Sequence, residues 1–565
     1  MKSTLLVLIL FFGSVAIAAP AQQNRSVSGK ITFIGKITGK TIVYIYRLQS
    51  ARNGAVRRLS KRDIYGAKAP FQTGTTDETG FYRFTGLPAG NYSLLAWIDQ
   101  NQNNHLDFDP PEPFGWYAAE TGGNIAVIDL TKEDRHNLQV KFRIPASFSK
   151  EEKRTKNGRL IYLKELPVLQ LWGSPQERGF AHGFLIGRQI LDFFEFYILE
   201  DSWKSPPRYQ KIFVPFLESG FNYPAEFLQE CDAVIHGMKA ANLDMRIESL
   251  GRDFSRTDLI AINAYIEKRA AFPVAPPSSC SQFAFWGDPT EGTSLQGGLI
   301  AARNMDGECD VRKVTVSHFL IFAVDPQTPG KQRWVSMMWP GFVGTISGIN
   351  ESGLYGMENA GSSKQGPVVG GNVPYSWTER FVLETQTGKS TPESVLKVMQ
   401  KFTNEAGGIT SPGSIILWTL PYTGQKTPAF VYEGNRFGGG MRLPGETRPE
   451  NANCIMATNH HLKYGYDIDK PGQVFGKPVS FSSRRRYETG MNTVEAWSRL
   501  HKKIDVADVK RLLQMVAHGS TEYSVIFLAN QKKILVAVDD LKTDLWDAPY
   551  LHWTEFRFDE FFSQK

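Results

Sequence analysis

The pattern of apolar residues changes once along this chain, near Leu160, and this change constrains the fold more than any other feature. Between Val27 and Pro145, apolar and polar side chains alternate in short runs separated by glycine-rich turns, which predicts strands. The clearest of these runs are Lys30–Gly35, Thr41–Arg47 and Asn91–Ile98. After Leu160, near-continuous apolar runs alternate with helical patterns, which is typical of sheets covered by helices. The chain therefore predicts an all-β unit followed by a larger unit of layered sheets and helices.

Size and composition indicate an ordinary globular protein. The 565 residues are 41% hydrophobic and 21% charged, enough for a large core and for two to four domains. The net charge of +7 arises from 64 basic and 57 acidic residues without a long block of one sign. A nucleic-acid-binding face would concentrate lysine and arginine, so we expect no nucleic-acid partner.

The first 18 residues have the pattern of a secretory signal. Lys2 supplies a positive charge, Leu5–Phe12 is apolar, and Ala16–Ala18 ends in small residues. There is no cysteine at this site for lipid attachment, and no later apolar run reaches the roughly 18 residues of a membrane span. We therefore expect signal peptide 1–18, no membrane span, and an exported protein, periplasmic or secreted.

A turn motif gives the N-terminal unit a family resemblance. The run Thr76–Phe84 reverses the chain at Gly80 and leads into Leu87–Tyr92. It resembles the prealbumin-like sandwich that is also called the carboxypeptidase-regulatory-like domain. The resemblance implies a β-sandwich over 27–145 with a stabilising or positioning role, followed by a charged linker, 146–158.

One loop of this unit carries oxygen-bearing side chains at alternate positions, as the first part of a calcium loop does. These residues are Asp99, Asn101, Asn103 and Asp107. However, Asn104 occupies the usual glycine position, and Pro110 stands where a bidentate glutamate is expected. A polar turn held by its own side chains is the alternative. Structural calcium is thus a candidate, and we expect no other cofactor.

In the second unit we expect two early helices and several long strands. Pro175–Ile198 and Tyr223–Ala241 have helical patterns, whereas Ile161–Trp172 resembles a strand. Two further apolar runs, Val314–Val324 and Trp334–Ser347, are expected to be β-strands.

Cys280 is the strongest candidate for a nucleophile. Four cysteines are too few for a disulfide scaffold. Cys280 follows the proline-containing segment 275–279, which cannot be helical, and precedes a strand-like run. Cys309 and Cys454 fall on predicted strands and are expected to be packed thiols.

A thiol nucleophile needs a base, and no histidine lies near Cys280 in the sequence. If the thiol attacks the carbonyl of Ser279, the chain is cut and Cys280 gains a free α-amine with a pKa of roughly 8. That amine could act as the base. We therefore predict self-cleavage between Ser279 and Cys280.

Five further segments support this hypothesis by resemblance. The region from Leu160 to the C-terminus resembles the acyl-coenzyme A:6-aminopenicillanic-acid acyltransferase family of N-terminal-nucleophile (Ntn) hydrolases, relatives of choloylglycine hydrolases and penicillin V acylases. The matching segments are Gly179–Gly183, Arg303–Asp306, Gly348–Leu354, Thr458–Asn459 and Ser482–Tyr487.

The resemblance implies a role for each matched side chain. Arg303 would orient the substrate carbonyl or the thiolate, and Asp306 would hold the α-ammonium group of Cys280. Asn459 would contact the reacting cysteine, and Arg486 is the arginine carried over from the Ser-Ser-x-x-Arg motif. Asn359 falls near the oxyanion-hole asparagine of the family, but the register differs by about one residue, which leaves Glu358 as a competitor.

The resemblance also implies an α+β fold, a four-layer αββα sandwich over 159–565. Residues 159–279 would precede the cut, and 280–565 would carry the nucleophile. The implied reaction is hydrolysis of a linear amide in a small N-acyl substrate through an acyl-thioester, or acyl transfer to an amine. Export away from acyl-coenzyme A favours hydrolysis.

Two other functions remain open. A phospholipase-B-like lipid hydrolase would use the same catalytic logic. A noncatalytic surface-binding or glycan-binding protein would use the sandwich and the 12% aromatic residues instead. His460 and His461 are adjacent, so on a regular strand they face opposite sides and cannot chelate one metal. Either pocket lining or ordinary packing would explain them.

Overall fold

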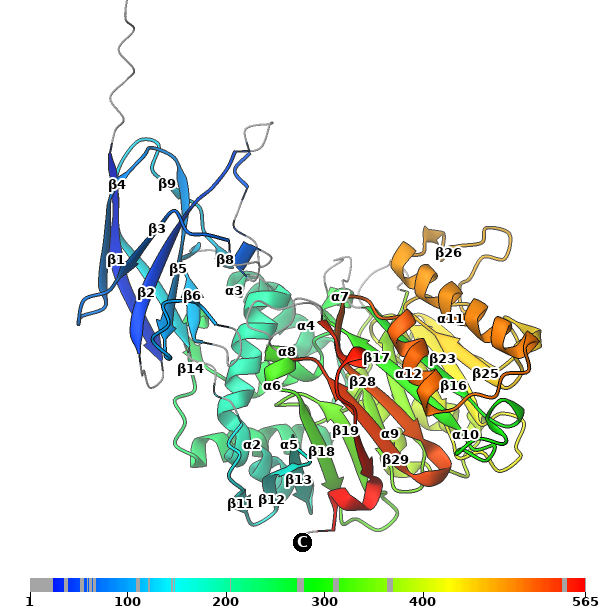
Figure 1. Ribbon diagram of the computed structural model, residues 1–565. Helices are drawn as coiled ribbons and strands as arrows, with labels where there is room; N and C mark the ends of the chain where they lie inside the picture. The colour runs from blue at the N-terminus through cyan, green and yellow to red at the C-terminus, as the bar shows by residue number, and fades with distance from the viewer. Residues whose placement is uncertain are drawn as a thin grey trace, which may run out of the picture.

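The computed structural model describes residues 24–34, 39–50, 55–57, 59, 63–64, 68–107, 112–119, 122–143, 146, 148–203, 205–271, 279–307, 314–362, 369–540 and 546–563 (Figure 1). The expected signal peptide and Cys309 lie outside these described residues. Within them, the chain forms a small all-β unit and a larger unit that contains both helices and strands.

Two sheets and a two-stranded ribbon, β7-β8, make up the N-terminal unit. One has the order β10-β1-β4 and the other β3-β2-β5-β6, with β9 also paired to β5. The strands are β1 (Arg25–Ile34), β2 (Lys40–Arg47), β3 (Gln72–Thr75), β4 (Phe81–Leu87), β5 (Asn91–Asp99), β6 (Phe114–Trp116), β7 (Ala118–Ala119), β8 (Gly122–Ile125), β9 (Ile128–Asp129) and β10 (Arg135–Arg143). Val27, Val43, Leu94 and Val140 from both sheets share one core. The sandwich is therefore observed, while its prealbumin-like identity stays a prediction.

The turn at Gly80 forms as expected. Gly80 has φ +82°, a conformation that favours glycine, and its N–H donates to the carbonyl of Asp77 at 3.0 Å. Along β4 the side chains of Tyr82 and Phe84 are buried and those of Phe81 and Arg83 are exposed. The period-two pattern of the sequence thus reports the two faces of a strand.

The larger unit contains a ten-stranded sheet. Its order is β11-β12-β13-β18-β19-β20-β21-β22-β23-β24. The strands are β11 (Lys153–Thr155), β12 (Gly158–Leu163), β13 (Leu166–Trp172), β18 (Leu320–Asp325), β19 (Trp334–Met338), β20 (Ser347–Asn350), β21 (Tyr355–Ala360), β22 (Ser414–Thr419), β23 (Ala429–Asn435) and β24 (Gly438–Arg442). Neighbours are antiparallel except β13 and β18, which are parallel. The segment before Cys280 thus supplies one edge of this sheet. β11 lies within the range predicted as linker.

A second, seven-stranded sheet carries Cys280. Its order is β25-β16-β17-β28-β29-β31, and β30 pairs with β28. The strands are β16 (Ser279–Phe285), β17 (Ile300–Asp306), β25 (Cys454–Ala457), β28 (Ser520–Leu528), β29 (Lys533–Val538), β30 (Trp546–Asp547) and β31 (Thr554–Arg557). Every residue of β16 and β17 is buried, because this sheet is covered on both faces.

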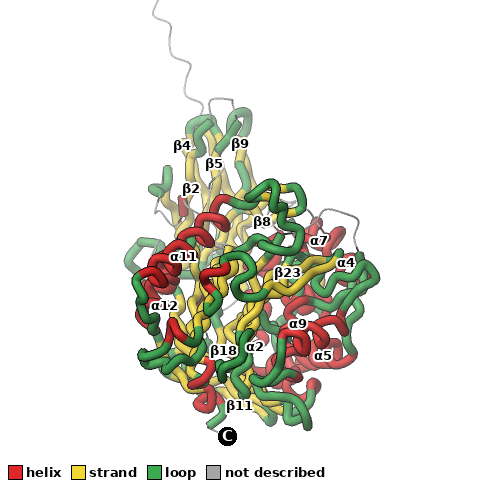
Figure 2. The backbone as a smooth tube through the Cα atoms, turned by 90° about the vertical axis from the view of Figure 1, so that its right-hand side faces the viewer, coloured by secondary structure: helices red, strands yellow, loops and turns green. Residues whose placement is uncertain are grey.

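The two sheets pack against each other between outer helices. β16 contacts β21 and β22 of the larger sheet, α11 and α12 cover the smaller sheet, and α2 and α9 cover the larger one. Figure 2 shows α11 and α12 on one side of the strands and α9 with α5 on the other. The longer helices are α2 (Pro175–Asp192), α5 (Ala225–Ala240), α6 (Arg256–Asn263), α9 (Tyr375–Thr385), α10 (Pro392–Met399), α11 (Phe481–Arg499) and α12 (Val506–Met515). This mixed architecture has the layer order expected for an αββα sandwich.

The short helices lie mainly between the longer ones. They are α3 (Pro206–Arg208), α4 (Val214–Ser219), α7 (Lys268–Ala271) and α8 (Val314–Ser317). Two segments, Phe193–Trp203 and Tyr209–Phe213, are π-helical. A two-stranded ribbon pairs β14 (Arg246–Ile247) with β15 (Arg252–Asp253), and another pairs β26 (Gln473–Val474) with β27 (Lys477–Pro478).

Three of the expected elements are wrong in detail. Ile161–Trp172 is the hairpin β12–β13, because Lys164 and Glu165 adopt φ of +46° and +73°. Val314–Val324 begins with the helix α8 before β18 starts. Trp334–Ser347 is divided between β19 and β20 by a break at Gly341, where φ is +88°. An unbroken apolar run marks burial but does not specify the backbone conformation inside it.

The two early helices form where the sequence predicts them. α2 begins after a capping box in which Ser174 and Glu177 satisfy each other's backbone N–H groups. Its α-helical part ends at Asp192, and the chain continues as the π-helical segment instead of as the α-helix expected to Ile198. α5 lies within the expected range Tyr223–Ala241 and packs along α2.

Direct contacts join the N-terminal unit to the larger one. Lys141 and Glu248 form an ion pair at 2.9 Å. The backbone N–H of Ala146 donates to Asp192 at 2.7 Å, and its carbonyl accepts from Gln189 at 3.0 Å. These contacts anchor the chain at the end of α2 as it leaves the sandwich.

A buried network of ion pairs crosses the helical layer of the larger unit. Arg178 on α2 pairs with Glu230 on α5 at 2.7 Å, and Arg380 on α9 pairs with the same carboxylate at 2.9 Å and with Glu384 at 2.8 Å. Lys331 pairs with Glu384 at 2.9 Å. We call these residues the ion-pair network; it joins helices from both sides of the predicted cut.

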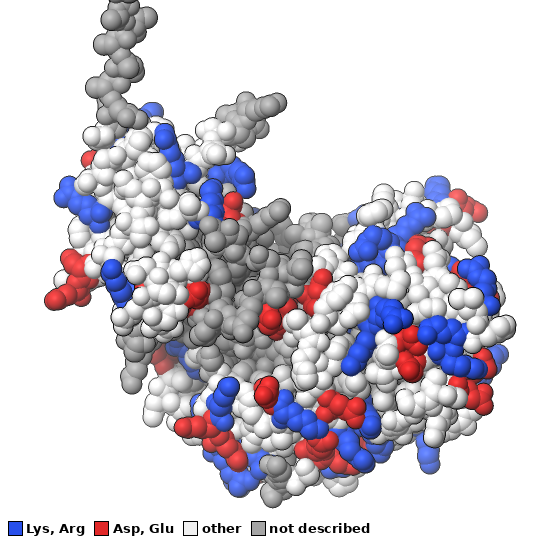
Figure 3. Space-filling model, in the orientation of Figure 1, with Lys and Arg blue, Asp and Glu red and all other residues white. Residues whose placement is uncertain are grey.

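The surface has no obvious charge polarity on the face drawn in Figure 3, where lysine and arginine are interspersed with aspartate and glutamate. Within the described part of the chain, no helix combines the length and apolar character that crossing a bilayer requires.

Candidate active site

Cys280 lies where a central strand of the smaller sheet extends past its neighbour. β25 pairs with β16 only from Gln282 to Phe285, so β16 continues to Cys280 without a partner on that side. The chain after β25 turns away at Thr458, and the side chain of Asn459 takes the place of the missing strand. Its Oδ1 accepts the backbone N–H of Cys280 at 2.8 Å. That nitrogen is the atom that would become the α-amine after a cut before Cys280.

The thiol is buried between two side chains of β17. Cys280 is 2% exposed, and its Sγ lies 3.7 Å from both the Arg303 guanidinium and the Met305 sulfur. Burial raises the pKa of the Cys280 thiol, and the positive charge of Arg303 partly offsets this effect. In the uncut chain the thiol therefore stays protonated near neutral pH, so reaction requires a base.

Arg303 is held rigidly by main-chain oxygens. Its guanidinium donates to the carbonyls of Ile346 and Glu358, and it also contacts the Met305 sulfur at 3.0 Å. The side chain is fully buried. A guanidinium fixed in this way presents a permanent positive charge to the thiol.

Arg486 reaches the same cysteine from α11. It donates to the carbonyl of Cys280, to the hydroxyl of Ser281 at 2.8 Å and to Oδ1 of Asn459 at 2.7 Å. One turn earlier, Ser483 accepts the backbone N–H of Asn459 at 2.9 Å. The Ser-Ser-x-x-Arg motif therefore binds both the cysteine backbone and the asparagine that holds it.

Asp306 ends β17 directly opposite Ser279 in the strand ladder. Its Oδ1 accepts the hydroxyl of Thr521 at 2.5 Å, and its Oδ2 lies 3.9 Å from the Arg486 guanidinium. Burial raises the pKa of the Asp306 carboxyl to about 6, against the opposing effect of Arg486. The carboxyl thus stands beside the predicted cut with one oxygen that has no hydrogen bond to any described residue.

Asn359 and Glu358 point to different faces of β21. The Asn359 amide donates to the carbonyls of Ala457 and Thr458, at 3.4 and 3.0 Å, and so fixes the end of β25. Glu358 is buried, and burial raises the pKa of its carboxyl to about 7. The amide of Asn459 donates to the carbonyl of Ala360 at 2.9 Å. Both asparagine amides therefore already bind main-chain oxygens in the uncut chain.

His460 and His461 make separate contacts, as expected for adjacent residues. Nδ1 of His460 lies 2.8 Å from the Ser483 hydroxyl, whereas Nδ1 of His461 lies 3.0 Å from the Tyr464 carbonyl. Burial lowers the pKa of His460 to about 4, so it is neutral at pH 7. Across the described ranges, no three histidine, cysteine, aspartate or glutamate side chains are grouped to hold a metal ion.

The candidate calcium loop holds itself together. The amides of Asn101 and Asn103 both donate to Asp107 at 2.6 Å. Asp99 accepts the backbone N–H groups of Asn103 and Asn104, at 3.1 and 3.0 Å. These bonds are those of the polar-turn alternative. Calcium binding stays a prediction, to be tested by titrating the folded protein with the ion.

The remaining described cysteines do not join the site. Cys231 and Cys454 are buried free thiols, as is Cys280. Burial raises the pKa of both Cys231 and Cys454, as it does for Cys280.

Sequence reasoning missed several polar residues close to this centre. Tyr265, Glu267, Tyr375 and Glu379 are buried residues that interact electrostatically with Glu358. Thr521 was also missed, although it positions Asp306. The sequence offers one signal for these residues, the charged pair Glu379–Arg380 within a helix that also contains apolar residues. A charged residue on a buried helix face needs a partner or a function.

Comparison with known proteins gives structural similarities at low sequence identity. No protein-family model matches the sequence, and no curated protein matches it. Among solved structures, the chain is similar to a Caenorhabditis elegans N-acylethanolamine-hydrolyzing acid amidase ortholog, with 14% identity, TM-score 0.31, and coverage of 44% of this chain and 93% of that one.

Two bacterial proteins give similar values. A conjugated bile acid hydrolase from Clostridium perfringens has 13% identity and a TM-score of 0.30 over 49% of this chain and 97% of its own. Penicillin V acylase from Agrobacterium tumefaciens has 14% identity and a TM-score of 0.30 over 46% of this chain and 83% of its own. Because all three TM-scores lie below 0.5, the function proposed for this chain rests on the geometry around Cys280.

Proposed function

We propose that this protein is an exported, self-processing cysteine Ntn hydrolase that cleaves a linear amide in a small N-acyl substrate. The observation that carries the proposal is the convergence of distant motifs on one thiol. Arg303, Asn459 and Arg486 each contact Cys280, although they come from three separate elements. A merely structural cysteine has no need of two buried guanidinium groups and an amide.

Self-cleavage would begin with attack of the Cys280 sulfur on the carbonyl carbon of Ser279. The C–S bond forms, the peptide C–N bond breaks, and the thiol proton ends on the released α-amine. Water then hydrolyses the thioester, which yields the Ser279 carboxyl group and the free thiol. Asn459 and Arg486, which bind the Cys280 nitrogen and carbonyl, would keep this backbone in place during both steps.

In the mature enzyme the free α-amine would take the thiol proton, and Asp306 would stabilise the resulting ammonium group. The thiolate, stabilised by Arg303, attacks the substrate carbonyl, and the departing amine receives the proton as the C–N bond breaks. Water then resolves the acyl-thioester. An amine in place of water would give acyl transfer, and export away from acyl-coenzyme A favours hydrolysis.

The first test compares the intact mass of the purified wild-type protein with that of Cys280→Ala. We expect two wild-type fragments with a junction between Ser279 and Cys280, and one uncut Cys280→Ala chain. Cys454→Ala is the matched control, because Cys454 is also a buried free thiol, and it should be cut like the wild type. Two fragments from Cys280→Ala would contradict the proposed mechanism.

The second test separates the proposed substrate class from the alternatives. The mature protein should hydrolyse short N-acyl amino acids and leave phospholipid vesicles intact. Preferential hydrolysis of the vesicles would favour a phospholipase-B-like enzyme. An uncut wild-type chain that is not acylated by either substrate would favour a noncatalytic binding protein.

A further inference from the structure

Several buried polar atoms around Glu358 have no hydrogen-bond partner among the described residues. Both carboxylate oxygens of Glu379, both of Glu358, one of Glu267 and the hydroxyl of Tyr375 lack a hydrogen-bond partner among the described residues. All four side chains are at most 1% exposed. We call these residues the carboxyl cluster. The Ser414 hydroxyl is near Glu358, but the two groups do not reach normal hydrogen-bond geometry.

These groups interact with one another across three segments of the chain. Glu379 and Tyr375 lie on α9, Glu358 on β21, and Glu267 just before α7. Tyr375 interacts electrostatically with all three carboxyl groups. The other oxygen of Glu267 accepts the backbone N–H of Tyr375 at 2.8 Å, which fixes the start of α9 beside the cluster. The ionisation of each carboxyl group in the cluster is therefore coupled to its neighbours.

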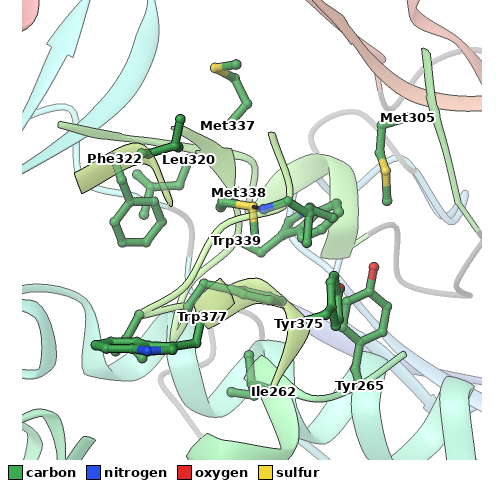
Figure 4. Close-up of a cluster of buried hydrophobic side chains, with 14 of the residues drawn as sticks. Ile262, Tyr265, Met305, Leu320, Phe322, Met337, Met338, Trp339, Tyr375 and Trp377 are labelled. Atoms are coloured by element: carbon green, nitrogen blue, oxygen red, sulfur yellow. Dashed lines mark hydrogen bonds between the residues drawn. The ribbon is translucent and has the colours of Figure 1, made fainter. Parts of the chain in front are cut away.

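Tyr265 connects the carboxyl cluster to the candidate nucleophile. It interacts with both the Glu358 carboxyl and the Cys280 thiol. Figure 4 shows its hydroxyl beside Tyr375 and directed toward the side of Met305, whose sulfur is 3.7 Å from Sγ of Cys280. Arg303 gives a second connection, because it contacts the Cys280 sulfur at 3.7 Å and donates to the Glu358 carbonyl.

The charges of this region do not balance when its carboxyl groups are ionised. Glu267, Glu358 and Glu379 would carry three negative charges, and Arg269 and Arg303 supply two positive ones. The catalytic thiolate would add another negative charge. An uncompensated buried carboxylate is strongly unfavourable, so the empty cluster must hold protons, and the pKa of each of the three carboxyl groups is raised.

We propose that the carboxyl cluster binds a primary ammonium group carried by the substrate. This inference rests on the proposed function and narrows its substrate class to N-acyl amides with a cationic amine. An ammonium group offers three N–H donors and no acceptor, so it supplies what these oxygens lack. An anionic substrate group would instead add a further negative charge beside these three carboxyl groups.

Calorimetric titration of the mature protein with n-butylammonium, n-butanol and butyrate at pH 8 tests the binding directly. We expect butylammonium to bind at least about tenfold more tightly than butanol, with butyrate weaker than both. Glu379→Gln should remove most of this preference. Equal affinities for the cation and the alcohol would overturn the inference.

The matched control is Glu384→Gln. Glu384 is the same residue type on the same helix and is equally buried, but it is paired with Arg380 and Lys331. It should keep the wild-type preference for butylammonium. The inference is wrong if both variants lose that preference equally. If Glu379→Gln does not fold, Glu358→Gln takes its place, with the same expected loss.

The affinity for butylammonium should increase between pH 6 and pH 8, because the pKa of Glu358 is about 7 and its carboxyl must lose a proton to bind a cation. The titratable and charged groups that interact with Glu358 are Tyr265, Glu267, Arg269, Arg303, Tyr375 and Glu379. An affinity independent of pH, or one that falls across this range, would contradict a carboxylate-bound ammonium.

Turnover then identifies which part of the substrate carries the cation. In one set of N-acyl amides the ammonium group is placed on the acyl part, and in a second set on the amine part, each beside a neutral analogue of equal length. A preference of about tenfold or more in kcat/KM in either set supports the inference. Acylation of Cys280 without preference in either set overturns this inference alone, whereas ammonium binding without any acylation overturns the proposed function alone.

Discussion

Helix α9 contains two kinds of buried charge only a few residues apart. Arg380 and Glu384 belong to the ion-pair network, in which Arg380 also donates to the Val343 carbonyl at 2.5 Å. Glu379 belongs to the carboxyl cluster, and neither of its oxygens has a hydrogen-bond partner among the described residues. Glu379 and Glu384 lie on the same helix and are equally buried. The difference is whether the protein itself supplies the opposite charge.

This difference separates a structural role from a binding role. Charges that are paired within the protein hold helices together, and here Arg178 and Glu230 precede the predicted cut while Arg380 and Glu384 follow it. The ion-pair network can therefore keep the two fragments associated after cleavage. Buried carboxyl groups without an internal partner hold protons in the empty protein, and such residues are typical of sites that bind a ligand.

The largest expected effect comes from breaking the ion-pair network. Arg380→Met removes one cationic partner from both Glu230 and Glu384, which keep Arg178 and Lys331 respectively, and we expect a loss of about 3–5 kcal/mol in the free energy of unfolding. Glu379→Gln removes no internal partner, so its change should stay below about 1 kcal/mol. Urea unfolding of both variants measures the contrast. Equal losses would show that the two groups of charges have the same role.

A smaller effect, on activity, should distinguish the two asparagines of the site. Asn459→Ala removes the acceptor for the Cys280 nitrogen and for Arg486, and should lower kcat on an N-acyl substrate by about a hundredfold while the fold persists. Asn359→Ala removes donors to the main chain after β25 and should instead cost about 1–3 kcal/mol of stability. Circular dichroism and steady-state kinetics separate these outcomes. Unchanged kcat in Asn459→Ala would remove it from the catalytic group.

The smallest expected effect is a pH dependence of stability that arises from the carboxyl cluster. The pKa of Glu358 is about 7 in the folded protein, above its ordinary value near 4.5, so the folded state binds more protons than the unfolded state between these values. Stability from this group is complete below about pH 4.5 and is lost as the pH rises through 7.

Thermal unfolding at pH 5 and pH 8 provides the measurement. We expect Tm to fall by a few degrees from pH 5 to pH 8, and by less in Glu358→Gln. Glu384 provides the contrast, because Arg380 holds the pKa of its carboxyl at about 2 and it stays ionised across this range. The same fall in Glu358→Gln as in the wild type would assign the effect to other groups.

Much of the fold can be predicted from local sequence motifs. The Ser174–Glu177 capping box fixes the start of α2, and the turn at Gly80 fixes a reversal in the N-terminal sandwich. Both depend on residues a few positions apart, which is why they can be read from the sequence. Apolar runs were less informative. The hairpin at Lys164 was missed because a left-handed turn within such a run leaves no periodic signal.

From the sequence alone, Cys280 can be placed at the start of a strand, together with the motifs that accompany it. Only the tertiary structure decided how those motifs meet: Asn459 replaces a missing strand beside Cys280, and Arg486 reaches it from α11. The tertiary structure also shows that the Glu384 carboxylate is paired with cations, whereas the Glu379 carboxyl group has no partner among the described residues. The physical reason is that a side chain's electrostatic environment is set by groups distant in sequence, whereas a cap or a turn is set by its immediate neighbours.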